Sequence, residues 1–167
     1  EKFNTYDIPA GRIGLLLGQD ALLPECGRLL ALKGCDIIAC SANLAGGFTA
    51  GHTGSEIVQN YPIPSGADPL HWHLFRTRAG ENNVYLAFAN ALGEDPLTGG
   101  FSGIFAPETF KFPRQEQAMF YDAGQVSQAI DTTNLAASAY PTNVVRRKDL
   151  VAMRLPHHYK PLLSCQD

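Results

Sequence analysis

Residues Gly11–Asp36 read GRIGLLLGQDALLPECGRLLALKGCD, and this stretch predicts the fold of the chain more strongly than any other. Its apolar run Arg12–Leu17 is short enough for a buried parallel strand. A helix pattern follows over Pro24–Gly34, and a second short apolar strand follows over Asp36–Ser41. Strand, helix and strand within about 30 residues form a βαβ unit, so we expect two parallel strands joined by a right-handed crossover.

Both ends of the predicted helix are signalled. Proline near the first turn favours a start at Pro24, and glycine favours a stop at Gly34. Leu29, Leu30 and Leu32 are expected on one side of this helix. Glu25 in the first turn and Lys33 at the last are interpreted as charges that complement the helix dipole.

The chain beyond this unit predicts a long loop and further α/β elements. Residues Ala42–Pro69 are rich in Gly, Ser, Pro and Asn without a sustained period, which predicts a long, functional or mobile loop. A helix is expected over Leu70–Asn83, with Trp72, Phe75 and Ala79 on one stripe. Strands are expected over Val84–Ala91 and around Ile104–Phe105.

The last third of the chain is harder to interpret. The stretches Gln115–Tyr121 and Val126–Ile130 fit strand or helix, and Val144–Arg154 could close with either element. The tail LPHHYKPLLSCQD is expected on a surface or against a partner.

Composition bounds the class of protein. The 167 residues suffice for one domain with a core, so we expect a single domain over residues 1–167. A net charge of −3 gives no electrostatic basis for binding nucleic acid or an anionic membrane. The four cysteines have no metal-type spacing, which favours buried thiols in a reducing, cytoplasmic setting.

The stretch that opens the chain's first βαβ unit resembles the nucleophile segment of the carbon–nitrogen hydrolases, the nitrilase/amidase superfamily. In that family a strand runs into an elbow that carries a catalytic Cys, followed by Asp and Pro-Glu. Here Asp20 and Pro24-Glu25 fall at the matching spacing, and Gly18 occupies the nucleophile position.

Three later stretches strengthen the resemblance. Arg78–Asn82, followed by Val84–Asn90, is similar to the family's Arg-Ala-x-Glu-Asn helix end and its strand that ends in Asn. Gly100–Pro107 is similar to its Gly-x-Ser strand, and Arg154–Tyr159 to its C-terminal tail. The motifs occur in the family's order.

The resemblance implies an α-β-β-α sandwich, of which this chain supplies about one half: a mixed sheet with helices on one face. It also implies a Glu–Lys–Cys triad for hydrolysis of amides or nitriles. The Glu and Lys belong to the family's N-terminal half, which is expected upstream of this C-terminal half, and the Cys is replaced by Gly18.

Cys40, Ser41 and Ser102 are the candidates for a replacement nucleophile. Cys40 closes the neighbouring strand and could point into the site, but a buried structural thiol is favoured. Ser41 and Ser102 lack a GxSxG elbow and an Asp–His partner. The histidines, among them the pairs His71/His73 and His157/His158, have poor ligand spacing, so we expect neither a metal nor a cofactor.

An elbow with glycine at the nucleophile position can still bind a ligand. Glycine adopts a positive φ without steric cost, so the fold tolerates the loss of the Cys. The resemblance places Gln19, whose N–H helps to hold the oxyanion, and Asp20, Ser41 and Asn43 at the oxyanion site and pocket.

The sequence therefore supports a carbon–nitrogen hydrolase-like domain without catalysis of its own. Two alternatives remain open: an active amidase or nitrilase of which this is a fragment or nucleophile-replaced variant, or a noncatalytic small-molecule-binding or assembly module. The expected ligand is a small amide, nitrile or carboxylate. The expected protein partner is a second copy of the chain or the missing N-terminal half, because a lone half leaves one sheet face uncovered.

Overall fold

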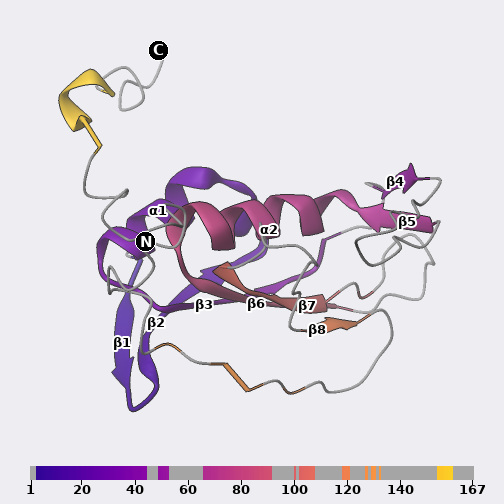
Figure 1. Ribbon diagram of the computed structural model, residues 1–167, viewed down its shortest axis with the longest axis horizontal. Coiled ribbons are helices and arrows are strands. Elements are labelled where there is room, and N and C mark those ends of the chain that lie inside the picture. The colour runs from indigo at the N-terminus through magenta and orange to yellow at the C-terminus, as the bar shows by residue number, and fades with distance from the viewer. Residues whose placement is uncertain are drawn as a thin grey trace, which may run out of the picture.

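Figure 1 shows a computed structural model of the chain. It describes residues 3–44, 49–52, 66–91, 100, 102–107, 118–120, 127, 129–130, 132 and 154–159. Its elements are, in chain order, β1 (Thr5–Ile8), β2 (Gly11–Leu17), the 3₁₀ turn η1 (Gly18–Leu22), α1 (Pro24–Leu32), β3 (Ile37–Ala42), β4 (Thr49–His52), β5 (Gly66–Pro69), α2 (Leu70–Asn82), β6 (Tyr85–Asn90), β7 (Ser102–Phe105), β8 (Ala118–Phe120) and the 3₁₀ turn η4 (Pro156–His158).

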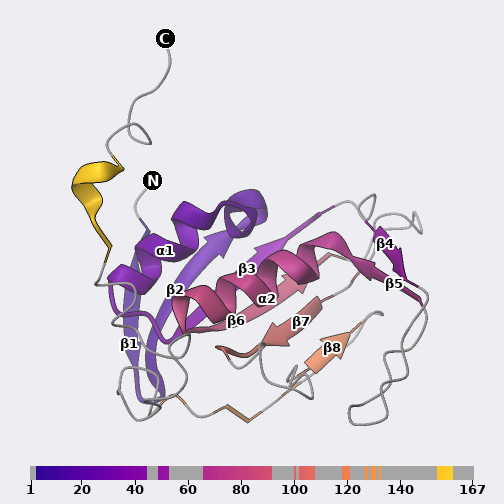
Figure 2. The same cartoon turned by 45° about the horizontal axis from the view of Figure 1, so that its top comes forward.

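The main sheet is mixed and has the strand order β1-β2-β3-β6-β7-β8. Strands β2, β3 and β6 run parallel to one another, and β1, β7 and β8 join by antiparallel pairing. Helices α1 and α2 lie side by side on the same face of this sheet, as both views show (Figures 1 and 2). The βαβ unit, the mixed α/β sheet and the placement of the helices on one face were predicted correctly.

Helix α1 starts at Pro24 and ends as predicted, but its buried side was predicted wrongly. Leu30 is fully buried, whereas Leu29 and Leu32 are exposed. The side that packs inward instead carries the small residues Cys26, Gly27 and Ala31 beside Leu30. These small residues permit close approach, and a Cβ added at Gly27 would lie 3.5 Å from the side-chain nitrogen of Asn82 on α2.

Helix α2 packs its predicted stripe onto the sheet. Phe75 and Ala79 have no exposed surface. The ring centroid of Phe75 lies 4.4 Å from that of Phe88 in β6 and 5.8 Å from that of Phe105 in β7. These aromatic contacts join the helix to two strands at the centre of the core. The side chain of Trp72 lies outside the described part of the structure.

The interpretation of Ala42–Pro69 as one long loop was wrong in part. This region contains β4 and β5, which pair antiparallel as a separate two-stranded sheet with Thr49 opposite Pro69 and His52 opposite Gly66. Their backbone pairing does not need an alternating apolar pattern, so periodicity alone could not find them.

Near the two ends of the chain, the structure agrees with some predictions and differs from others. Strand β1 was not predicted, and the ambiguous stretch 115–121 contains the strand β8. The tail turn η4 is exposed, as expected, at His157, His158 and Tyr159. The stretch 144–153 and most of 121–131 lie outside the described residues. No helix in the described ranges is long and apolar enough to cross a membrane.

Candidate functional site at the carboxyl edge of the sheet

The three parallel strands end together at one edge of the sheet. Leu17 in β2 lies opposite Ser41 in β3, and Ser41 lies opposite Ala89 in β6. Ligands of α/β sheets bind outside the carboxyl ends of the strands, because the loops that follow gather there. The residues that follow these strand ends therefore form the candidate site.

Gly18 makes the turn that leaves β2. Leu17 is still extended, with φ −130° and ψ 138°, and Gly18 then adopts a positive φ of 57°. This is the left-handed region, which glycine enters without the clash that a Cβ causes. A Cβ added to Gly18 would meet no atom within 4 Å. The elbow therefore has open space where a side chain would project.

Cys40 lies beneath this elbow. It is 3 % exposed, and its Sγ is 3.9 Å from the carbonyl oxygen of Gly18, where the thiol is the donor. Burial, with the nearby charge of Asp20 as a second cause, raises the pKa of the Cys40 thiol to about 11. A thiol with this pKa is about 0.01 % ionised at pH 7. Cys40 is thus a buried packing residue whose reactive thiolate form is suppressed.

The proposed pocket residues all lie along this edge. Gln19 is exposed in η1, and Ser41 and Asn43 are exposed at and just after the end of β3. Asp20 is half-buried. Its Oδ2 accepts a long hydrogen bond of 3.5 Å from the backbone N–H of Leu17, so its side chain caps the turn weakly. The fold brings these four residues to one edge.

Asn90 is a residue of this edge whose role the sequence did not reveal. Its Oδ1 accepts a hydrogen bond from the N–H of Leu44 at 2.8 Å, and its Nδ2 donates to the carbonyl oxygen of Leu44 at 3.1 Å. Its own N–H donates to Oγ of Ser102 at 3.0 Å. Asn90 therefore fixes the segment after β3, and Ser102 serves as an acceptor in this support. The strand-terminal Asn was the available signal.

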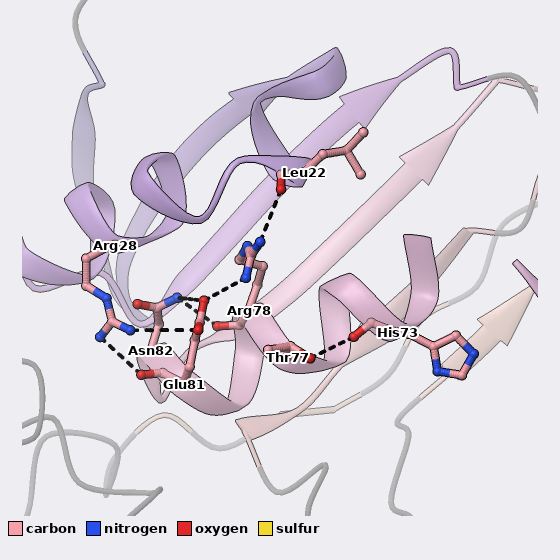
Figure 3. A network of polar contacts seen from close by, with 7 residues as sticks. All are labelled: Leu22, Arg28, His73, Thr77, Arg78, Glu81 and Asn82. Atoms are coloured by element: carbon pink, nitrogen blue, oxygen red, sulfur yellow. Dashed lines mark hydrogen bonds and ion pairs between the residues drawn. The ribbon is translucent and has the colours of Figure 1, made fainter. Parts of the chain in front are cut away.

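The motif residues Arg78, Glu81 and Asn82 form a polar network behind the elbow (Figure 3). Arg78 is 8 % exposed and forms an ion pair of 2.9 Å with Glu81, while its second terminal nitrogen donates to the carbonyl oxygen of Leu22 at 3.1 Å. Because Leu22 is the last residue of η1, Arg78 ties helix α2 to the turn that begins at Gly18.

Helix α1 joins the same network through Arg28. Its guanidinium donates to the carbonyl oxygen of Glu81 at 3.2 Å and lies 3.9 Å from the Glu81 carboxylate. Partial burial lowers the pKa of Arg28, an effect that the nearby Glu81 partly offsets. The Arg-Ala-x-Glu-Asn segment thus holds α1, α2 and η1 together, which explains this motif as a structural support for the elbow.

Glu25, Lys33 and His73 lie on the helices or at a helix end, outside the turn at Gly18. Glu25 is in the first turn of α1, and Lys33 caps its last turn and donates from Nζ to the carbonyl oxygen of Phe3. His73 on α2 lies 3.4 Å from a guanidinium nitrogen of Arg76.

Comparison with known proteins agrees with this fold. No protein-family model matches the sequence. The chain is 28 % identical over 163 residues to the Omega-amidase NIT2 of Homo sapiens. This match covers 93 % of this chain and 50 % of the amidase. It is 32 % identical over 93 residues to a nitrilase of Pyrococcus abyssi, covering 56 % of this chain and 27 % of the nitrilase.

The solved structures that resemble it include amidases from Nesterenkonia sp. AN1. One, a variant with a covalent acetamide adduct on its active-site cysteine, aligns with 96 % of this chain and 48 % of its own at a TM-score of 0.65 and 18 % identity. Another crystal structure of the amidase gives a TM-score of 0.62 over 97 % of this chain and 48 % of its own, at 17 % identity.

The mixed α/β sheet, with both helices on one face and a turn at Gly18 after the parallel strand β2, defines the class of fold. The chain is similar to members of the nitrilase/carbon–nitrogen hydrolase superfamily, as the amidase and nitrilase matches show. It spans about half the length of the curated Omega-amidase that it matches.

Proposed function

We propose that this chain is a carbon–nitrogen hydrolase-like domain that does not catalyse hydrolysis on its own. The observation that carries the proposal is Gly18 at the elbow after β2, the position of the nucleophilic Cys in the resembled motif. Glycine offers no side chain to attack an amide or nitrile carbon, and covalent catalysis of this kind needs an activated nucleophile.

Among the residues that the structure describes, no neighbour of Gly18 is suited to replace the nucleophile. Cys40 is buried below the elbow with its thiol toward a carbonyl oxygen and a pKa of about 11. Oγ of Ser102 accepts a hydrogen bond from the backbone of Asn90 and has a supporting role. Ser41 is exposed at the end of β3, and none of the described contacts joins its hydroxyl to a side chain that could act as a base.

The same edge keeps features that suit binding without cleavage. The open space at Gly18 leaves room for a small ligand, and we assign the N–H of Gln19 as a donor to a carbonyl or carboxylate oxygen. Ser41 and Asn43 would supply polar groups beside it. The proposed ligand class is a small amide, nitrile or carboxylate.

The decisive experiment measures ammonia release from acetamide and butyramide. The wild-type chain is expected to release none above the buffer rate. A thermal-shift series with acetamide and acetate reports binding separately, because a ligand that binds the native state raises its melting temperature. Turnover by the wild-type chain would overturn the proposal.

A second candidate is an amidase whose nucleophile has been replaced. The open space around the Cβ position of Gly18 favours it, because a cysteine side chain would meet no neighbour there. In Gly18→Cys, a peptide-mapped acrylamide adduct at residue 18 would show that the site accepts a nucleophile. Ammonia release by the variant would favour this second candidate over the first.

We further propose that residues 1–167 form one domain, the C-terminal part of the superfamily fold, and that the protein works in the cytoplasm. Cys26 and Cys40 are buried free thiols, which supports a reducing setting. Proteolysis that leaves a single protected core would support the single domain.

A further inference from the structure

The chain that leaves β3 parts from the sheet beside the candidate site. The parallel pairing of β3 with β6 runs in register as far as Ala42 opposite Asn90. One more backbone hydrogen bond follows, in which the N–H of Ala91 donates to the carbonyl oxygen of Ala42 at 2.8 Å. Two residues further on, Leu44 is bonded to a side chain of β6 in place of its backbone.

The side chain of Asn90 takes the place of a partner strand for Leu44. Its Oδ1 accepts from the N–H of Leu44 at 2.8 Å, and its Nδ2 donates to the carbonyl oxygen of Leu44 at 3.1 Å. A carboxamide has one acceptor end and one donor end, so it satisfies both backbone groups of one residue. The reversed orientation would put oxygen against oxygen and N–H against N–H. These two contacts therefore define how the carboxamide is oriented.

This contact draws the segment after β3 toward the helix side of the sheet. Side chains alternate along a strand, so Phe88 and Asn90 of β6 point to the same face. That face carries the helices, because the ring of Phe88 packs on Phe75 of α2 at 4.4 Å. The side chain of Leu44 packs against the same core. The continuations of β3 and β6 therefore diverge at the carboxyl edge, where α/β sheets bind their ligands.

Asn43 is fixed from both sides by this arrangement. The residue before it, Ala42, is held by the last backbone bond between β3 and β6, and the residue after it, Leu44, is held by Asn90. Asn43 itself is exposed. A pocket residue whose backbone is already ordered loses little conformational entropy when a ligand binds, which favours binding.

We infer that Asn90 is a positioning residue of the candidate site, whose carboxamide holds the segment Asn43–Leu44 in the shape that binds a small amide or carboxylate. The ligand in this inference rests on the proposed function, whereas the hold on Leu44 can be observed without a ligand. Asn90 acts through Asn43 and does not touch the ligand itself. Its own backbone is fixed in turn, because its N–H donates to Oγ of Ser102 at 3.0 Å.

Two substitutions of Asn90 separate positioning from general stability. Asn90→Leu removes both hydrogen bonds to Leu44. Asn90→Asp keeps the acceptor for the N–H of Leu44, but at neutral pH it sets a carboxylate oxygen against the carbonyl oxygen of Leu44. A protonated carboxyl group has one donor and one acceptor, so acid restores the pattern of the carboxamide. The ordinary pKa of an aspartate is about 3.9, and the facing carbonyl oxygen raises it.

The experiment measures two quantities by NMR at about pH 7 and about pH 4. One is the hydrogen-exchange protection of the Leu44 amide without ligand, and the other is the dissociation constant of acetamide, which is uncharged at both pH values. Asn90→Leu is expected to lower the protection and the affinity about tenfold at both pH values. Asn90→Asp should show both losses at neutral pH and recover both in acid. The control Thr77→Val removes a side-chain hydrogen bond of 2.9 Å within α2 and should change neither quantity.

Unchanged protection of Leu44 in Asn90→Leu would overturn the inference, and so would an acetamide affinity equal to that of the wild-type chain. Losses in Asn90→Asp that acid does not reverse would also overturn it, because they would show general destabilisation. If Asn90→Leu fails to fold, Asn90→Asp still decides, since one variant is compared with itself at two pH values. A wild-type chain that binds neither acetamide nor acetate contradicts the proposed function, and the protection of Leu44 then decides separately whether Asn90 holds the segment.

Discussion

At the residue scale, the backbone geometry of the turn after β2 favours glycine at position 18. Its φ of 57° suits glycine, and the space beside it is empty. A substitution at this position can therefore be judged for backbone strain alone, without a contribution from steric clashes. A residue with a Cβ would strain the backbone but would not collide with a neighbour.

Gly18→Ala is expected to lower the free energy of unfolding by about 1 kcal/mol, the cost of a left-handed conformation for a residue with a Cβ. Gly18→Asn should cost less, because asparagine tolerates this conformation. Urea unfolding measures both.

Gly14→Ala is the matched control for crowding. Its Cβ would lie 2.7 Å from Sγ of Cys35 and 2.8 Å from a methyl group of Leu30, so the core must shift, at about 1–3 kcal/mol. Equal losses at Gly14 and Gly18 would contradict the geometry described for the elbow.

The pKa of Cys40 predicts how stability depends on pH. Its folded pKa of about 11 lies above the ordinary thiol value of 9.0, so the folded state holds its proton longer. The contribution is fully present below about pH 9 and is lost as the pH rises toward about 11. Relative to Cys40→Ala, the wild-type chain should lose about 3 kcal/mol over this range, measured by urea unfolding. A constant difference would contradict a buried, protonated thiol.

At the scale of elements, the β2-α1-β3 unit was predictable because both helix ends and both strands carry strong local signals. The buried side of α1 was not, since the close approach to α2 that selects Gly27 over Leu29 is a tertiary effect. Strand β1, with the sequence Thr5–Ile8, is short and exposed and depends on its pairing with β2. Its four residues are too few for a period to show.

The candidate site was predictable to a similar extent. The resemblance indicated Gly18 and the residues after the strands, and the fold brings them to one edge. The support that Asn90 gives to Leu44 joins residues 46 positions apart, and no local pattern reports a pairing of that kind.

The network around Arg78 predicts a stability difference between two ion pairs. Arg78→Met removes the hydrogen bond to the Leu22 carbonyl and the 2.9 Å ion pair with Glu81, which should cost about 2 kcal/mol in urea unfolding, while Arg28 stays near the Glu81 carboxylate. Hydrogen exchange should also speed up in η1 before the core opens.

The control for this prediction is the exposed pair of Asp7 and Arg12, with 2.7 Å between Oδ1 and Nε. The guanidinium lowers the pKa of Asp7, but both side chains are solvated, so Asp7→Asn should leave stability unchanged within error. An equal loss in Asp7→Asn and Arg78→Met would contradict the supporting role of Arg78.

At the scale of the whole molecule, the chain is one helix-covered sheet with a second apolar face. That face explains why β2 carries exposed Leu15 and Leu17 in a sequence that is otherwise ordinary in composition.

We propose that the chain keeps the fold around this elbow but does not hydrolyse amides on its own, because Gly18 stands at the nucleophile position. The most direct measurement is ammonia release from acetamide by the purified wild-type chain, with the Nesterenkonia amidase as the positive control. A rate equal to that of buffer alone is expected. Sustained release that scales with the concentration of the chain would contradict the proposal.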